Sequence, residues 1–443
     1  MLAGLVALAV AALLSVGVQA GAPKNWAATW ATGNKVALIP GFDDERPPPS
    51  TDDEVGTTLR QIVRISLGGE YFRVWLTNEL GTSPLAVGAA NLAVRSVDSA
   101  IEGSGQPLTF GGSTGVTIPA GERVASDPVY LPAQDLADLA ISIFLPGPTS
   151  ESSPITYHPR ALQTNYQLDG VDATGAPDLP GAIENFVFAY LAAVDVATKG
   201  KVAVVATIGD SLTDGDGATL FPEPIDLNAR YPNYLAELIL ERNSPGIGRR
   251  VGQIAAVANV GISGNQVTNT LIGLRGQDRL ARDVLPLSGV THVIIWEGIN
   301  DIGLPYFLGV LGGNPTPAHT PAAAIIAGLQ DMAEQARAAG LKVIGCTITP
   351  SGGYFFPGYN VAGSPTADPI RQEVNAWIRT SGAFDVVVDL DALVRDDDGD
   401  PRFIRGEPGE LTIDGLHYTP AAYRMIAEEI FASLFRGNGN HLL

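Results

Sequence analysis

The residues of this chain best suited to nucleophilic chemistry lie in short segments that are far apart in the sequence. Ser211 follows Thr207-Ile208-Gly209-Asp210, and of the five histidines only His417 has an acidic residue, Asp414, three positions before it. A serine hydroxyl is a weak nucleophile that needs a base within hydrogen-bond reach, and a carboxylate can hold an imidazole in the required tautomer. Ser211, His417 and Asp414 are therefore the candidate nucleophile, base and orienting acid.

Attack on a carbonyl group creates an oxyanion, which needs preorganised hydrogen-bond donors. The candidate donors are the N–H of Ser211, the N–H of Gly264 and the side-chain amide of Asn300. A glycine at 264 allows close approach of the backbone, and Gly261 is a lower-ranked rival for this role. Together these residues indicate acyl transfer.

Structural interpretations compete with these roles. The segment around Ser211 has the composition of an ordinary strand-to-loop turn, and Asp414 has that of a helix-entry turn residue. Asp210 and Asp301 are predicted to bond loop backbone. The other histidines have structural interpretations. His292 is assigned to a strand, His319 to a Pro-rich loop, His441 to the C-terminal tail and His158 to a Pro-flanked stretch of the β region.

Five apolar runs in the C-terminal half read as buried parallel strands, because they are continuous rather than alternating. They are residues 202–207, 254–260, 290–296, 341–348 and 385–390. Helices are predicted at 322–339 with Thr320 as N-cap and Pro321 at the first position, at 369–379 with Asp368 as N-cap, and at 420–435 with Thr419 as N-cap. This alternation predicts a doubly wound α/β sheet. The four candidate segments are then expected to be loops just past strand ends, which line one edge of such a sheet; they carry Ser211, Gly264, Asn300 and the pair Asp414 and His417.

The region from Trp26 to about Val196 shows short strands separated by Gly and Pro, with almost no helical periodicity. Strands are predicted at 59–67, 71–77, 85–97, 115–118, 124–131, 139–145 and 186–196, with Gly68-Gly69 as the turn of a hairpin. Residues 41–57 and 146–181 are predicted to be loop-rich. This region is predicted to be an all-β sandwich or jelly roll.

Composition restricts the class of partner. The chain has 443 residues and a formal net charge of -20, which disfavours nucleic acid and anionic membranes. Residues 1–20 read as a secretory signal peptide, although the n-region has no basic residue, and a retained membrane anchor is the alternative. The single cysteine, Cys346, lies in an apolar run and is predicted to be a core residue rather than a nucleophile.

One further motif contains side chains of the type that binds metal ions. Asp396-Asp397-Asp398-Gly399-Asp400 has some features of a calcium loop, but Pro401 stands where the loop requires glycine. A solvated acidic loop is therefore the favoured interpretation.

The segments Gly209-Asp210-Ser211-Leu212, Gly264, Gly298-Ile299-Asn300-Asp301 and Asp414-Gly415-Leu416-His417 resemble, in order, the four blocks of the SGNH (GDSL) hydrolase family. The layout with an extra β domain is similar to a subgroup of secreted SGNH esterases that includes carbohydrate esterases. The resemblance implies a flavodoxin-like α/β/α domain, a Ser-His-Asp triad, a Ser/Gly/Asn oxyanion hole and no metal or organic cofactor. The expected organisation is a signal peptide (1–20), a β-sandwich domain (23–197) and an SGNH hydrolase domain (201–438).

The expected function is that of a secreted or periplasmic serine esterase, and its expected partner is an ester substrate, with acetylated polysaccharide favoured by analogy. A lipase, lysophospholipase or arylesterase of the same family is one alternative. A non-catalytic carbohydrate-binding protein on a degenerate scaffold is the alternative from another class. No nucleic acid partner, and no integral membrane association after signal cleavage, is expected; the sequence leaves the oligomeric state open.

Overall fold

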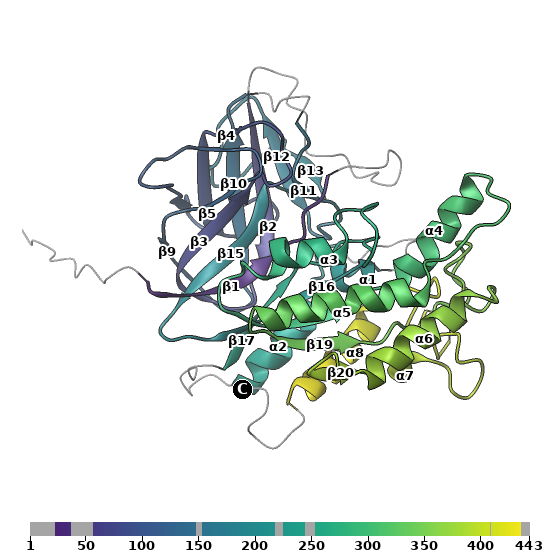
Figure 1. Ribbon diagram of the computed structural model, residues 1–443. Coiled ribbons are helices and arrows are strands. Elements are labelled where there is room, and N and C mark those ends of the chain that lie inside the picture. The colour runs from purple at the N-terminus through teal and green to yellow at the C-terminus, as the bar shows by residue number, and fades with distance from the viewer. Residues whose placement is uncertain are drawn as a thin grey trace, which may run out of the picture.

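The computed structural model describes residues 23–36, 56–147, 153–217, 225–243, 253–407 and 409–435. The predicted signal peptide (1–20), His441 and most of the predicted loop at 41–57 lie outside these ranges. A β region and an α/β region lie side by side and in contact (Figure 1). No helix in the ranges given is long and apolar enough to cross a membrane.

The β region forms two antiparallel sheets, as predicted for a sandwich. Its strands are β1 (Asn25–Ala31), β2 (Thr57–Arg64), β3 (Gly69–Thr77), β4 (Leu85–Val87), β5 (Ala89–Val94), β6 (Gln106–Pro107), β7 (Val116–Ile118), β8 (Arg123–Ala125), β9 (Val129–Ala133), β10 (Asp138–Leu145), β11 (Tyr157–His158), β12 (Asn165–Asp169), β13 (Ile183–Asn185), β14 (Phe188–Ala189) and β15 (Leu191–Thr198). One sheet has the order β1-β15-β3-β8, with β9 also on β3, and the other has the order β13-β12-β2-β10-β5-β6. Two small pairs, β11-β14 and β4-β7, complete the region.

The predicted hairpin at Gly68-Gly69 is wrong, because β2 and β3 belong to different sheets. Neither glycine has the positive φ that a tight hairpin turn requires. A side chain at Gly68 would instead clash with the backbone near Gln134, at 2.3 Å, so the glycine serves close packing where the chain crosses between sheets. The alternation of residue types in β2 suggests one buried and one exposed face, but both faces are buried. Arg60 on the polar face is fully buried and donates to Ser142 and to backbone carbonyls.

The α/β region contains one five-stranded parallel sheet. Its strands are β16 (Ala203–Gly209), β17 (Ile254–Asn259), β18 (Val290–Trp296), β19 (Lys342–Cys346) and β20 (Val386–Val388). The order β17-β16-β18-β19-β20 is that of a doubly wound, flavodoxin-like sheet, which confirms the predicted fold class. In this order the switch point lies between β16 and β18, so the loops after these strands meet at the ligand-binding edge.

Helices cover both faces of the parallel sheet. They are α1 (Ser211–Asp214), α2 (Tyr231–Asn243), α3 (Gly276–Arg279) with a π-helical turn at Leu280–Val284, α4 (Ile299–Leu311), α5 (Ala322–Ala338), α6 (Ala367–Thr380), α7 (Leu390–Val394) and α8 (Pro420–Phe435). Two predicted caps are wrong: Pro321, not Thr320, is the N-cap of α5, and Asp368 lies inside α6, where it pairs with Arg371. Thr419 does accept a hydrogen bond from Ala422 in the first turn of α8.

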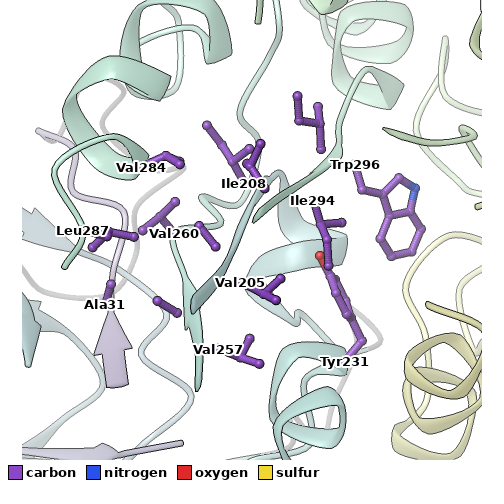
Figure 2. Close-up of a cluster of buried hydrophobic side chains, with 14 of the residues drawn as sticks. Ala31, Val205, Ile208, Tyr231, Val257, Val260, Val284, Leu287, Ile294 and Trp296 are labelled. Carbon is purple, nitrogen blue, oxygen red and sulfur yellow. The ribbon is translucent and has the colours of Figure 1, made fainter. Parts of the chain in front are cut away.

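The hydrophobic core runs without a break from the β region into the α/β region. Figure 2 shows Ala31 of β1 in one cluster with Val260, Leu287 and the side chains of the parallel strands. Val205 faces Tyr231 of α2, whereas Ile208 faces Val284, because residues of opposite parity point to opposite sides of a strand.

The edge of β17 is covered by the β region. Ser66 both accepts from the N–H of Val257 and donates to its carbonyl oxygen, at 3.1 and 3.0 Å. Ala28 of β1 donates to the carbonyl of Ser288, at 2.8 Å. The two bonds of Ser66 satisfy backbone groups of an edge strand that would otherwise be unpaired, and the bond of Ala28 joins β1 to the loop before β18. The β region is therefore built into the structure of the α/β region.

Candidate active site

Ser211 is held at the junction of β16 and α1. The carboxylate of Asp210, the N-cap of α1, accepts a hydrogen bond from the N–H of Leu212 at 3.0 Å. A side chain at Gly209 would come within 2.2 Å of the carbonyl oxygen of Trp296, so the tight strand-to-helix turn requires glycine here. The helix ends at Gly215 with φ 96°, a conformation that favours glycine. This turn fixes Ser211 as the first helical residue.

His417 lies between Ser211 and Asp414. Its Nε2 is 3.0 Å from the Oγ of Ser211, and its Nδ1 is 2.8 Å from a carboxylate oxygen of Asp414. The other oxygen of Asp414 accepts the N–H groups of Leu416 and His417, at 2.9 and 2.8 Å. A carboxylate that accepts from Nδ1 leaves the lone pair of Nε2 directed at the serine hydroxyl. The structure brings the three predicted side chains together, and their roles as nucleophile, base and orienting acid stay predictions.

The turn that carries His417 packs against a second loop. Gly415 has φ 89°, and a side chain there would meet the carbonyl oxygen of Gly352 at 2.8 Å. The ring of Tyr354 in that loop stands edge-on to the His417 ring, with centroids 5.8 Å apart. The loop therefore limits the movement of the imidazole.

The three candidate oxyanion donors come from connected elements. The N–H of Ser211 belongs to the first turn of α1, where backbone donors have no intrahelical acceptor. Gly264 has φ 80°, and Asn300 lies in the first turn of α4 rather than in a loop. The side chain of Asn300 donates to the carbonyl oxygen of Asn265 at 2.9 Å, which ties the Gly264 segment to α4. Gly261, the rival donor, packs behind α1, where a side chain would meet the N–H of Asp214 at 2.4 Å.

Tyr359 orients Asn300, a role that the sequence did not predict. Its hydroxyl donates to Oδ1 of Asn300 at 2.7 Å. Because Nδ2 of Asn300 faces a carbonyl oxygen, which only accepts, the two bonds fix which end of the amide carries the hydrogens. One hydrogen of Nδ2 goes to Asn265, and the second remains for a ligand. The Pro- and Gly-rich segment around Tyr359 gave no signal of this role.

Arg279 is a second residue without a sequence signal. Its guanidinium is fully buried and donates to the carbonyl oxygen of Gly209 and to the side chain of Asn265, both at 2.6 Å. It thus joins the end of β16 to the Gly264 segment. Five geometrically fixed donors make arginine suited to such a junction.

Three buried carboxyl groups lie beneath this edge of the sheet. Asp301 accepts from the N–H groups of Val267 and Thr268, at 2.8 and 2.9 Å, which agrees with its predicted structural role, as does the cap formed by Asp210. Burial raises the pKa of Asp301 to about 6 despite these bonds, and raises the pKa of Glu297 to about 7 despite the nearby Arg279. Burial and the neighbouring Glu297 also raise the pKa of Asp210 well above its usual value.

Other residues considered in the sequence make local contacts of their own. Nδ1 of His292 lies 2.7 Å from the hydroxyl of Thr291 in β18, and His319 stacks on Tyr306 with its Nδ1 2.7 Å from the carbonyl oxygen of Ile302. Cys346 is buried, and burial raises the pKa of its thiol. Asp396 and Asp400 bond Gly399 and Arg402. Within the described ranges, no group of three or more His, Cys, Asp or Glu side chains is arranged to hold a metal ion.

Comparison with known proteins places these features in a family. No curated protein matches the chain significantly. Similar solved structures include a carbohydrate acetylesterase from Sinorhizobium meliloti (16% identity, TM-score 0.37, 52% of this chain and 96% of that one) and an aryl esterase from M. smegmatis (17%, 0.37, 52% and 99%). A catalytic mutant of an acetylxylan esterase from Geobacillus stearothermophilus is a third (21%, 0.35, 52% and 93%). Residues 207–425 match the model of the GDSL-like Lipase/Acylhydrolase family, and the α/β region of this chain therefore belongs to that family of carboxylic ester hydrolases.

Proposed function

We propose that this chain is an exported serine esterase in which Ser211 is the nucleophile, His417 the general base and Asp414 the residue that orients it. The observation that carries this proposal is the continuous series of contacts from Asp414 through His417 to the Oγ of Ser211, at 2.8 and 3.0 Å. Both His417 and Ser211 are almost buried, with exposed fractions of 5% and 6%. A low-dielectric setting strengthens such polar contacts.

In the first step, the Oγ of Ser211 attacks the ester carbonyl while Nε2 of His417 takes its proton. The carbonyl oxygen becomes an oxyanion, to which the N–H of Ser211, the N–H of Gly264 and Nδ2 of Asn300 donate. Collapse of this intermediate breaks the bond to the alcohol, which leaves with the proton from His417. Water then attacks the acyl-serine while His417 takes a proton from it. Collapse of the second intermediate breaks the bond to Oγ of Ser211, which receives the proton back from His417, and the carboxylic acid is released.

The favoured substrate is an uncharged polysaccharide that carries small acyl groups, such as acetyl. The net charge of -20 disfavours polyanionic glycans and anionic lipid surfaces, because like charges repel. Phe355 and Phe403, near the turn that carries His417, are 50% and 38% exposed. Exposed aromatic side chains are suited to stacking on sugar rings. Export is proposed from the apolar sequence of residues 1–20.

The same exposed side chains favour a second candidate within the family. With Ile413, which is 55% exposed, Phe355 and Phe403 give the surroundings of the site an apolar character. Gly352 donates to the carbonyl oxygen of Arg402 at 2.8 Å, so the segments that carry the two phenylalanines are joined. An apolar rim of this kind also suits long-chain acyl or aryl esters.

A direct comparison of substrates separates the two candidates. The enzyme is assayed on acetylated xylan and on p-nitrophenyl octanoate, each with the parent and the Phe355→Ala variant. Tyr130→Ala serves as the matched control, because Tyr130 is 53% exposed but lies on β9, in the β region. We expect release of acetate from xylan, reduced in Phe355→Ala and unchanged in Tyr130→Ala. Efficient octanoate hydrolysis without acetate release from xylan would favour the second candidate and contradict the first.

A further inference from the structure

A histidine of the β region reaches the back of the candidate active site. His158 lies in β11 and is 3% exposed. Its Nδ1 is 2.7 Å from the carbonyl oxygen of Gly33, and its ring stacks on Phe188 with centroids 6.1 Å apart. Gly33 itself abuts the segment before Gly264, since a side chain there would meet Ile262 at 2.7 Å. The imidazole is thus fixed by the β region on two sides.

The other nitrogen of His158 meets Asp214. Its Nε2 lies 3.1 Å from Oδ1 of this residue, the last of the short helix α1 that begins at Ser211. Asp214 is 2% exposed. Its Oδ2 accepts from both the N–H and the hydroxyl of Ser263, at 2.9 and 3.0 Å. Ser263 directly precedes Gly264, so a single carboxylate joins His158 to the segment of a candidate oxyanion donor.

The charges of His158 and Asp214 favour a strong interaction between the two side chains. Both nitrogens of His158 face oxygen atoms that accept hydrogen bonds, which suits an imidazolium paired with a carboxylate. Burial opposes ionisation of Asp214, but its interactions with His158, together with Arg230 and the N–H of Ser263, outweigh burial and lower the pKa of Asp214. Removal of one partner from a buried pair leaves an uncompensated charge.

We propose that His158 is a positioning residue for catalysis: through Asp214 and Ser263 it holds the N–H of Gly264 in line with the oxyanion that forms at Ser211. The inference rests on the proposed serine mechanism. It gives the β region a part in the reaction in addition to its part in folding. A donor displaced by about 1 Å loses most of its value in the transition state, at a cost of up to about 10²-fold in rate.

The test compares His158→Gln with His158→Asn. The amide nitrogen of glutamine can occupy the place of Nε2 and donate to Asp214, whereas that of asparagine can occupy the place of Nδ1 and reach only Gly33. Ser288→Ala is the matched control, because the Ser288 hydroxyl donates to Asp195 across the same interface at 2.8 Å, rather than to Asp214. Each folded variant is assayed with p-nitrophenyl acetate well below its Tm.

We expect kcat to fall about 10- to 100-fold in His158→Asn with little change in KM, to recover most of that loss in His158→Gln, and to stay unchanged in Ser288→Ala. A second readout is the preference for the oxygen ester over its thiono analogue, whose sulfur is a poor hydrogen-bond acceptor. This preference should shrink in His158→Asn and persist in His158→Gln.

Equal kcat in the parent and both His158 variants would overturn the inference, and so would equal losses in Gln, Asn and the Ser288 control. If His158→Asn does not fold, His158→Gln and Asp214→Ala carry the test, because Asp214→Ala removes the link from His158 to Ser263. Parental kcat in Asp214→Ala with an unchanged ester preference would also overturn the inference. A failure of the serine mechanism itself can be distinguished, because Ser211→Ala would then keep the parental rate, whatever the rates of the His158 variants.

Discussion

Two buried His–Asp pairs in the described part of the chain differ in what faces the second nitrogen of the imidazole. In His417–Asp414 that nitrogen faces the hydroxyl of Ser211, at 3.0 Å, whereas in His158–Asp214 it faces the carbonyl oxygen of Gly33, at 2.7 Å. A hydroxyl can give up a proton and a carbonyl oxygen cannot. A carboxylate beside a histidine therefore does not by itself make a general base, because the group that faces the other nitrogen decides whether the pair can move a proton or only hold a position.

The two pairs also differ in origin. Asp414 and His417 are three residues apart and share one turn, so their contact is largely a local property of the chain. His158 and Asp214 come from β11 and α1, in different regions of the fold. The first pair can therefore form wherever its turn forms, whereas the second requires the β region to be docked. Matched substitutions in the two pairs test this difference.

The largest expected difference lies between the two histidines. We expect His417→Gln to lower kcat by about 10⁴- to 10⁶-fold, because no group then takes the proton of Ser211. His158→Gln keeps a donor at Asp214 and should lose less than about 10-fold. Steady-state kinetics on p-nitrophenyl acetate check both values. Comparable losses in the two variants would abolish the distinction between the pairs.

The acids should differ in the same direction but by less. Asp414→Asn is expected to lower kcat about 10⁴-fold, because the amide favours the wrong tautomer of His417. Asp214→Asn should cost at most about 10²-fold, since Ser263 keeps one acceptor and only the position of Gly264 shifts. The same assay checks the order, and a greater loss in Asp214→Asn than in Asp414→Asn would contradict it.

Tyr359→Phe should have a smaller effect on the site. Without the hydroxyl that donates to Oδ1 of Asn300, the amide keeps one fixed hydrogen bond, to Asn265. Loss of one hydrogen bond is worth about 1 kcal/mol, so we expect kcat to fall by about 5- to 10-fold with KM unchanged. Tyr306→Phe is the control, because the Tyr306 ring stacks on His319 rather than on Asn300. An unchanged kcat in Tyr359→Phe would show that the Tyr359 hydroxyl does not position Asn300 for catalysis.

The smallest effect concerns stability and pH. In the parent the pKa of Asp214 is lowered in the folded state, so Asp214 contributes stability above its unfolded pKa of about 3.9 that is lost as the pH falls. In His158→Ala, burial acts with less opposition, so the pKa of Asp214 is lowered less and its contribution to stability is smaller. The Tm difference between parent and variant should therefore shrink between about pH 6 and pH 3.

Thermal unfolding monitored by circular dichroism at several pH values checks this prediction. Ser288→Ala, which loses an interface hydrogen bond but no pairing with Asp214, should show a Tm difference that varies much less with pH. A difference between parent and His158→Ala that does not change with pH would mean that the two groups do not form an ion pair.

The sequence predicted the parts of the fold that depend on local pattern. The five parallel strands have apolar runs that end close to the observed bounds, and β18 agrees at both ends with the predicted 290–296. The four loops that follow strand ends are joined at one edge of the sheet because parallel strands end there together. The contact of Ser211 with His417 across 206 residues is a consequence of that topology.

What the sequence did not predict depends on partners that are distant in the chain. β12 lies in a segment expected to be loop-rich, and it forms because β2 offers it a hydrogen-bonding edge. The Asn300 segment was expected to be a loop, although α4 begins there and carries Pro305 within it, which obscured the helical pattern. His158, Tyr359 and Arg279 act through single contacts whose partners no local pattern reveals. The domain limits 23–197 and 201–438 stay predictions.

The most direct test of the central claim is the capture of the acyl-enzyme. The parent and Ser211→Ala are mixed with p-nitrophenyl acetate, quenched in acid within the first turnover, digested and analysed by mass spectrometry. We expect one acetyl group on the peptide that contains Ser211 in the parent, and none on the equivalent peptide of the variant. Turnover in the parent without acetylation of Ser211, or an equal rate in Ser211→Ala, would contradict it.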